Sequence, residues 1–404
     1  MGVDAQAGAG RRPYRWVMLA GVWLVYACFG LTVSSMAPLV QPIVEELGLS
    51  LAGMGSVMGA WPFVYLAAAL PAGAFVDRVG LTRSLALATL LIALSAGLRT
   101  VAGGQLGLFL AVGVFGLGGP LVSAGAPKLI SSWFGADERG TALGIYMTGP
   151  AVGTVAALSL TNSVMMPWLD GDWRAVLRCY AGVVVLCGVL WMVVTRHPAA
   201  RAAEVARAAR RPEPLLRVFL ALLKASLVRR VLLLSVAIFW INHGLNNWLP
   251  EILRAGGMSA ERAGFWASVP IVVGIAGALT IPRFAIRGRR IAVLGTMFVC
   301  AGLGVALLDS GVDLGLAIGL VAQGVAKSAM MPVAVLLLIE SKAVGPHRAG
   351  TAGGLFFTVA EIGGVLGPLS LGYVADVTGG FSAALWMLGG LCALGLLVLR
   401  GLRE

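Results

Sequence analysis

The sequence is poor in charge. Only 12% of its 404 residues are Asp, Glu, Lys or Arg, whereas 59% are hydrophobic and the mean hydropathy is +0.91. Soluble domains carry about 25% charged residues. A water-soluble globule, a disordered chain and a fibrous repeat are therefore excluded, and the composition indicates a polytopic membrane protein.

The chain also lacks the motifs of common catalytic and nucleotide-binding sites. It contains no GxSxG, no HExxH and no GxxxxGK[ST] phosphate loop. Its five cysteines stand singly in apolar runs, and its three histidines are scattered, so neither a metal centre nor a disulfide framework is expected. We expect no enzyme, no cofactor and no ATP-driven pump, so any transport would draw on an ion gradient.

Twelve apolar runs are long enough to cross a bilayer, which takes about 20 residues. They cover residues 16–38, 52–75, 84–101, 107–131, 141–165, 173–195, 227–249, 259–283, 291–308, 314–338, 350–373 and 382–400. The first run is too long for a signal-peptide core and lacks a cleavage site, so we interpret it as an uncleaved span. The expected fold class is an all-α membrane protein with twelve transmembrane helices.

The basic residues indicate the orientation of the chain. Lys and Arg accumulate in cytoplasmic loops, and most of the 30 basic residues fall on the cytoplasmic side if both termini lie there. We expect a multi-pass protein of the cell membrane with cytoplasmic ends. The net charge of +12 then reflects topology and does not indicate nucleic-acid binding.

One connection is much longer than the others. Residues 196–226 are rich in Ala and Arg and are interrupted at Pro212 and Pro214. We expect a cytoplasmic linker whose basic stretch lies on anionic lipid of the inner leaflet. It separates two halves, 1–195 and 227–404, each with six spans.

The two halves are related in sequence. Residues 140–153 (GTALGIYMTGPAVG) align with 350–363 (GTAGGLFFTVAEIG) at a shift of 210, and 61–78 align with 266–283. Two related bundles packed face to face favour alternating access, in which a midplane site opens first to one side and then to the other. The sequence therefore predicts two pseudo-symmetric six-helix bundles.

Residues 73–83 (GAFVDRVGLTR) resemble the signature of the major facilitator superfamily between its second and third spans. The resemblance covers essentially the whole chain and implies the major facilitator fold. It also implies that Asp77 faces the amino terminus of the eleventh helix, where a carboxylate is favoured, and latches one conformation. Five residues are expected to act in gating and conformational change: Asp77, Arg78, Gly80, Arg83 and Arg139.

Two further segments are similar to particular branches of the superfamily. Residues 247–253 (NWLPEIL) and 257–259 (GMS) are similar to the cyanate and 2-nitroimidazole permease branch. Residues 149–153 (GPAVG) are similar to the core of the antiporter motif, although its upstream glycine spacing is absent. A proton-driven efflux antiporter for drug-like or amphiphilic metabolites is therefore the alternative function.

Two charges lie near the middle of spans, where each costs about 2.5–3.5 kcal/mol. Lys327 shares a helix face with Gln323, and Glu361 shares one with Thr358. The repeat position of Glu361 in the first half is Ala151, whereas a structural ion pair should recur in both halves. We expect Lys327 to bind an anionic solute and Glu361 to carry a proton, with a structural ion pair as the alternative.

The other candidates for the solute site are polar or aromatic. The seventh span carries four polar residues near its outer end, Asn242, His243, Asn246 and Asn247. They bind solute, close the external gate or hydrogen-bond across a helix interface. Tyr65 is a further aromatic residue at a plausible depth. The predicted substrate-binding residues are Lys327, Gln323, Asn242, His243, Asn246, Tyr26, Trp61, Tyr146, Trp266 and Thr358, and for each of the four aromatic ones packing is the alternative.

The sequence thus predicts a secondary active transporter for a small organic or inorganic anion attracted by Lys327. Lys128, near the inner end of the fourth span, either snorkels to the lipid headgroups or adds positive charge to the inner vestibule. Its expected partners are the solute, protons and membrane lipid. No GxxxG dimer face stands out among the 56 glycines, so a monomer is expected. A membrane-integral enzyme or sensor is the alternative of a different class.

Overall fold

The computed structural model describes residues 3–200, 222–286, 288–310, 313–341, 344 and 349–402. Within these ranges all regular secondary structure is helical. Twelve helical segments are long and apolar enough to cross a membrane, which confirms the expected fold class. Residues 201–221 of the predicted linker lie outside the described ranges.

Six spans precede residue 201. They are formed by α1 (Val3–Ser34) with η1 (Ala37–Leu39) and α2 (Val40–Leu47), α3 (Leu51–Met58) with α4 (Ala60–Val79), α5 (Leu81–Arg99), α6 (Gln105–Trp133), α7 (Ala136–Leu160) with η2 (Thr161–Met165) and α8 (Met166–Trp168), and α9 (Trp173–Thr195). Helix α1 packs on α7 and α9, and α5 packs on α6 and α9. These helices form the N-terminal bundle.

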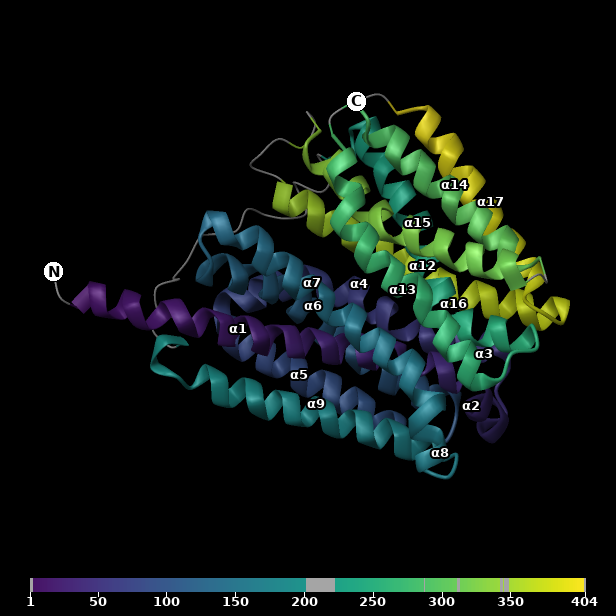
Figure 1. Cartoon of the computed structure of the whole chain (residues 1–404), viewed down its shortest axis with the longest axis horizontal. Helices are drawn as coiled ribbons and strands as arrows, with labels where there is room; N and C mark the ends of the chain where they lie inside the picture. The colour runs from purple at the N-terminus through teal and green to yellow at the C-terminus, as the bar shows by residue number, and fades with distance from the viewer. Residues whose placement is uncertain are drawn as a thin grey trace.

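Six spans follow residue 222. They are α12 (Ser226–Ala255), α13 (Ala260–Thr280) with η3 (Ile281–Phe284), α14 (Arg290–Leu308), α15 (Asp313–Ile339), α16 (Ala349–Thr378) and α17 (Ser382–Arg400). Helix α12 packs along α16, and α14 packs on α15 and α17. Figure 1 shows this C-terminal bundle in green and yellow beside the purple and blue N-terminal bundle.

Two spans are less regular than the sequence predicted. The first breaks after Ser34 and resumes as η1 and α2, where Pro38 and Pro42 lack a backbone N–H. The second divides at Gly59, where a Cβ atom would stand 3.1 Å from the carbonyl oxygen of Val365 in α16. Both breaks lie at the same end of the molecule.

The internal repeat places one glycine of each half in the same close contact. A Cβ atom at Gly153 of α7 would stand 1.9 Å from the carbonyl oxygen of Ala27 in α1, and one at Gly363 of α16 would stand 2.0 Å from that of Val236 in α12. The two glycines are equivalent in the repeat. They explain why α1 with α7, and α12 with α16, are the most extensive helix contacts of their halves.

We expect Gly153→Ala to destabilise the protein strongly. The added methyl group would overlap the backbone of α1, and forcing such a group into a packed interface typically costs about 1–3 kcal/mol. The melting temperature in detergent measures the effect. Gly144→Ala is the matched control on α7, because nothing lies within 4 Å of a Cβ atom there; equal melting temperatures would contradict the packing argument.

The two bundles meet mainly at one end, the closed end. There a Cβ atom at Gly55 of α3 would stand 2.4 Å from the carbonyl oxygen of Pro368 in α16. One at Gly264 of α13 would stand 2.4 Å from that of Leu158 in α7. Figure 1 shows the two halves diverging toward the opposite end, the linker end, where α1 begins and α9 finishes.

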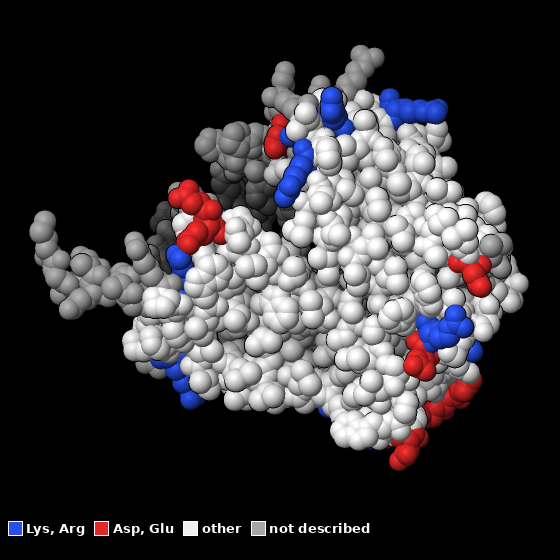
Figure 2. Space-filling view, in the orientation of Figure 1, with Lys and Arg blue, Asp and Glu red and all other residues white. Residues whose placement is uncertain are grey.

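Charged side chains gather at the two ends of the molecule. Figure 2 shows a broad uncharged belt between them on the face in view. Large apolar side chains such as Leu90, Leu186 and Phe265 are more than half exposed. Such a belt is typical of a surface in contact with lipid.

Candidate functional site

Lys327 lies inside the C-terminal bundle on α15. Its Nζ donates to Oδ1 of Asn246 on α12 at 2.5 Å. Gln323, one turn earlier, donates through Nε2 to the carbonyl oxygen of Ala301 at 2.8 Å. The ammonium is thus held by a neutral amide, with no carboxylate paired to it among the described residues.

Four of the predicted residues line one small cavity: Asn242, Asn246, Gln323 and Lys327. Leu158 of α7 belongs to the same wall, so both bundles contribute to it. The cavity holds about 20 Å³, little more than one water molecule. A solute of several carbon atoms is larger than this cavity and therefore fits only in a conformation in which the cavity is wider.

Glu361 lies on α16 and is 4% exposed. Its Oε2 has no hydrogen-bond partner among the described residues. A Cβ atom at Gly364 would stand 2.3 Å from this Oε2 and 3.0 Å from Nδ1 of His243, so the carboxyl and the imidazole border the same spot. Burying an unpaired carboxylate is costly, so this group is suited to taking up a proton.

Lys327 and Glu361 do not pair with each other. The ammonium of Lys327 donates a hydrogen bond to Asn246, whereas Oε2 of Glu361 lies beside His243. No ion pair joins the two charges in the described part of the chain. The alternative interpretation, a structural ion pair, is therefore wrong for this conformation.

His243 lies between two aromatic rings. The Trp61 ring of α4 is 5.2 Å from it at an interplanar angle of 28°, and the Phe239 ring is 5.3 Å away at 24°. Because Trp61 belongs to the N-terminal bundle, this stack joins the two bundles beside Glu361. The Nε1 of Trp61 is buried without a hydrogen-bond partner among the described residues.

Phenol groups gather on the N-terminal side of the same region. The rings of Tyr26 and Tyr146 stack at 4.5 Å, and the hydroxyl of Tyr26 lies next to Ser123. Tyr65 lies near both Ser123 and Glu361. Phe29 links this group to Trp61 through an edge contact at 6.3 Å.

Two predicted solute-site residues lie apart from these contacts. The Trp266 ring makes an edge contact with the neighbouring Phe265, which is 58% exposed, and it does not line the small cavity. Thr358 is half-buried on α16, one turn before Glu361. Neither makes a hydrogen bond within the described ranges that would tie it to Lys327.

The predicted gating residues lie at the linker end. Asp77 accepts from Nζ of Lys128 in its own bundle at 2.6 Å, and both side chains of this ion pair are exposed. Residues 345–348, which precede the eleventh helix that Asp77 is expected to face, lie outside the described ranges. Gly80 has a φ of 93°, which favours glycine and accounts for the tight turn. Arg139 donates to the carbonyl oxygen of Ser131 at 3.0 Å, closing the connection between α6 and α7. Arg78 and Arg83 are exposed.

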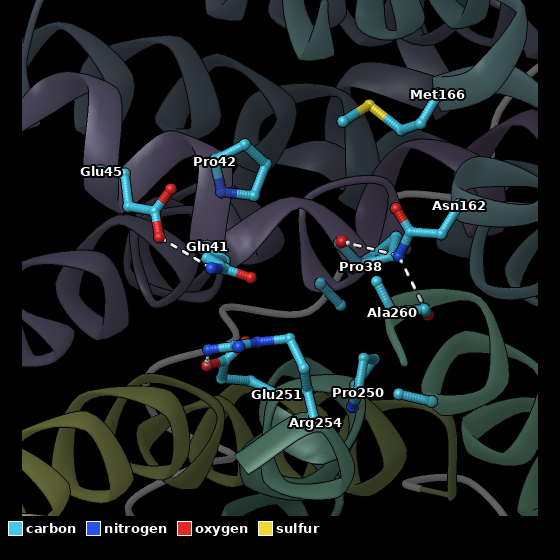
Figure 3. Close-up of a pocket in the computed structure, with 12 residues that line it drawn as sticks. Pro38, Gln41, Pro42, Glu45, Asn162, Met166, Pro250, Glu251, Arg254 and Ala260 are labelled. Carbon is cyan, nitrogen blue, oxygen red and sulfur yellow. Dashed lines mark hydrogen bonds and ion pairs between the residues drawn. The ribbon is translucent and has the colours of Figure 1, made fainter. Parts of the chain in front are cut away.

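A cavity of about 270 Å³ at the closed end was not predicted from the sequence. Figure 3 shows Gln41 and Glu45 of α2 across this cavity from Glu251 and Arg254 of α12. Arg254 pairs with Glu251 through two hydrogen bonds of 2.9 and 2.5 Å. These residues lie where consecutive spans are joined. Hydropathy alone predicts that polar side chains at such places are exposed, so it does not predict a cavity there.

The chain is similar in sequence to known membrane transporters. The chain matches the profile of the Major Facilitator Superfamily over residues 22–312 and 254–404. It is 24% identical to a probable galactarate/D-glucarate transporter of Bacillus subtilis, over 93% of this chain and 89% of that protein. It is 25% identical to a hexuronate transporter of the same species, over 89% and 87% of the two chains.

Solved structures show the same fold. A nucleoside transporter superposes with a TM-score of 0.78 at 15% identity, covering 95% of this chain and 99% of that one. A D-xylose–proton symporter superposes with a TM-score of 0.74 at 16% identity, covering 97% and 98%. At these identities the likeness concerns the fold alone.

The relatives reported above do not support the narrower resemblance to the cyanate and 2-nitroimidazole permease branch. They agree with the fold on a multi-pass membrane transporter of small solutes. The family profile covers most of the chain, and the two related halves have the expected number of spans. The chain belongs to the major facilitator superfamily.

Proposed function

We propose that this protein is a proton-coupled secondary transporter of a sugar acid, a small hydroxylated carboxylate. The observation that carries the proposal is the half-buried ammonium of Lys327, which donates a hydrogen bond to the neutral amide of Asn246. A solute carboxylate would supply the missing counter-charge through a stronger, charge-assisted hydrogen bond. The named solutes of the two Bacillus subtilis relatives, galactarate/D-glucarate and hexuronate, have this chemistry.

The two bundles would bind different parts of such a solute. Lys327, with Asn242 and Asn246, offers the C-terminal bundle a cation and amides for the carboxylate. The hydroxyls of Tyr26 and Tyr146 offer the N-terminal bundle partners for the sugar hydroxyls. Closure of both bundles on one solute is what alternating access requires.

Glu361 is the proposed proton carrier. Its Oε2 has no donor among the described residues, and it borders His243 at the stack that joins the bundles. Desolvation favours the neutral form of a carboxyl group, and a nearby cation favours the charged form. Solute that neutralises Lys327 would therefore favour protonation of Glu361.

The linker end is proposed to face the cytoplasm. It carries Arg78, Arg83 and Arg139 among many other basic residues, as the positive-inside rule requires. Both termini then lie inside, and the structure corresponds to a carrier closed toward the outside. We propose that it acts as a monomer whose linker-end residues, led by Asp77, help to set the resting conformation.

A smaller anion is the second candidate. The cavity at Lys327 holds only about 20 Å³ in this conformation. Residues 247–253 are similar to the cyanate permease branch, which favours an anion of a few atoms. A transport assay can separate the two candidates directly.

The test is exchange transport by the purified full-length protein in liposomes. We expect preloaded D-glucuronate to drive uptake of labelled D-glucuronate, and unlabelled D-glucuronate, unlike neutral D-glucose, to compete. Protein-free liposomes give the background. Exchange of cyanate or of lipophilic cations, with none of D-glucuronate, D-galactonate or galactarate, would reject the sugar-acid proposal.

A further inference from the structure

Two unpaired charges lie near the middle of the spans, and they flank one helix. Lys327 of α15 binds Asn246 of α12, and Glu361 of α16 lies beside His243, one turn earlier on α12. The other titratable groups that face Glu361 are His243 from α12 and Tyr65 from α4. The described part of the site thus contains one cation and one carboxyl group.

Arg99 is a third charged residue within the spans and is buried, but it lies apart from Lys327 and Glu361. Its guanidinium donates to the carbonyl oxygen of Thr32 at 2.8 Å and to the hydroxyls of Ser35 and Ser95 at 3.1 and 3.2 Å. These partners all belong to α5 and the end of α1, and Arg99 lines neither of the two cavities above. Its guanidinium therefore lies outside the site that contains Lys327 and Glu361.

The charge of the site depends on what it holds. With Glu361 ionised and no solute, Lys327 and Glu361 sum to zero. With a monocarboxylate on Lys327 and a proton on Glu361, the sum is again zero. A solute without a proton, or a proton without a solute, leaves one unbalanced charge, which is costly in a membrane interior. Only the empty form and the doubly loaded form can then reorient readily.

We propose that the protein is an electroneutral carrier that moves one monocarboxylate with one proton and discriminates against dicarboxylates. The proton binds Oε2 of Glu361 on one side of the membrane and leaves it on the other. A dicarboxylate brings a second negative charge that no further cation of the described site balances. This inference rests on the proposed function, because it specifies the charge and stoichiometry of the same site.

The experiment uses the full-length protein in liposomes, with valinomycin and K⁺ to set the membrane potential. D-glucuronate and D-galactonate are six-carbon probes with one carboxylate, and galactarate is the open-chain dicarboxylate that matches D-galactonate. We expect a pH gradient, alkaline inside, to drive D-glucuronate uptake at a rate that changes less than twofold with potential. An internal pH dye should report one proton per D-glucuronate, and galactarate uptake should be at least tenfold slower.

Glu361→Gln gives a signature that a merely structural residue would not. The variant should keep exchange but lose accumulation driven by a pH gradient. Its empty form would carry the charge of Lys327, so net uptake should become dependent on potential and be driven by a positive interior. Glu261→Gln, an exposed Glu at the start of α13, is the matched control and should behave like the wild type.

The experiment distinguishes failure of this inference from failure of the proposed function. Transport that generates current, more than one proton per solute, or equal uptake of galactarate would overturn this inference while leaving a sugar-acid carrier. Absence of transport of all three acids would overturn the proposed function instead. Loss of proton coupling in His243→Gln but not in Glu361→Gln would place the proton on the imidazole and overturn the role of Glu361.

Discussion

Lys327→Gln is expected to abolish sugar-acid accumulation and to weaken solute binding by roughly 30-fold or more. Removing one partner of a buried charge pair costs about 2–5 kcal/mol, because the other charge is left without compensation. In this variant the solute carboxylate would meet only the amides of Asn242 and Asn246. Titration calorimetry with D-glucuronate, together with exchange in liposomes, measures both effects.

Controls separate this loss from misfolding. The glutamine amide can still donate to Oδ1 of Asn246, so we expect the melting temperature of Lys327→Gln to stay close to that of the wild type. Lys224→Gln is the matched control, because Lys224 is exposed and precedes α12. Wild-type affinity in a folded Lys327→Gln protein would contradict the role of this ammonium in binding.

The double variant Lys327→Gln with Glu361→Gln tests the two residues together. Replacing two buried charges by neutral groups can be nearly neutral for stability. A working site predicts a folded protein that does not accumulate solute against a gradient. Uptake at the wild-type rate, driven by a pH gradient, would show that both residues are dispensable for coupling.

Features that depend on local pattern could be predicted from the sequence. The spans follow from the lengths of apolar runs, and the i, i+4 spacing correctly placed Lys327 with Gln323 and Asn242 with Asn246 on shared faces. The alignment of residues 140–153 with 350–363 also pairs Gly153 with Gly363, and the structure places these two glycines in the same close helix contact. The spacing of residues along a helix and the composition of the apolar runs are enough to predict these features, because each feature depends on residues within one helix or one repeat.

Features that depend on how helices meet could not be predicted. The stack of Trp61 on His243 requires two bundles to dock, and Arg99 at the end of a span resembles a loop charge although it is buried under α1. The ion pair of Asp77 with Lys128 likewise joins two helices, α4 and α6, that are 51 residues apart in the chain. A single sequence identifies each of these residues but does not identify the helix surface that each one contacts.

Asp376 is another residue whose role emerges only from docking. It lies near the end of α16, and its carboxylate accepts hydrogen bonds from the backbone N–H groups of Leu51 at 3.0 Å and Ala52 at 2.7 Å. These donors form the amino terminus of α3, in the other bundle. A carboxylate there satisfies unpaired donors and is favoured by the helix dipole. Asp376 therefore ties the two bundles together at the closed end.

Opening of the closed end must break this contact. The helices around it are already in backbone contact, since a Cβ atom at Gly372 of α16 would stand 2.3 Å from the carbonyl oxygen of Leu51. The carboxylate cap accordingly stabilises the conformation seen here over one in which α3 and α16 have separated. A cap of this kind contributes about 0.5–2 kcal/mol.

We expect Asp376→Asn to favour a conformation in which the two bundles have separated at the end that is closed here. The equilibrium constant should change by roughly 2- to 30-fold, which corresponds to about 0.5–2 kcal/mol. The amide loses the charge and can accept through one atom only. Spin labels at residues 168 and 262, exposed positions of α8 and α13, report the separation of the bundles there. The longer-distance population should grow in the variant.

Asp172→Asn is the matched control for this shift. Asp172 caps α9 within the N-terminal bundle, where the N–H of Ala175, the N–H of Arg174 and the Arg178 guanidinium lower its pKa below the usual range. The same chemical change there removes a helix cap but no contact between bundles, so it should lower the melting temperature without changing the distance distribution. A distribution that is unchanged in Asp376→Asn, or changed equally by both variants, would show that the cap on α3 contributes to the stability of the fold and not to the choice between conformations.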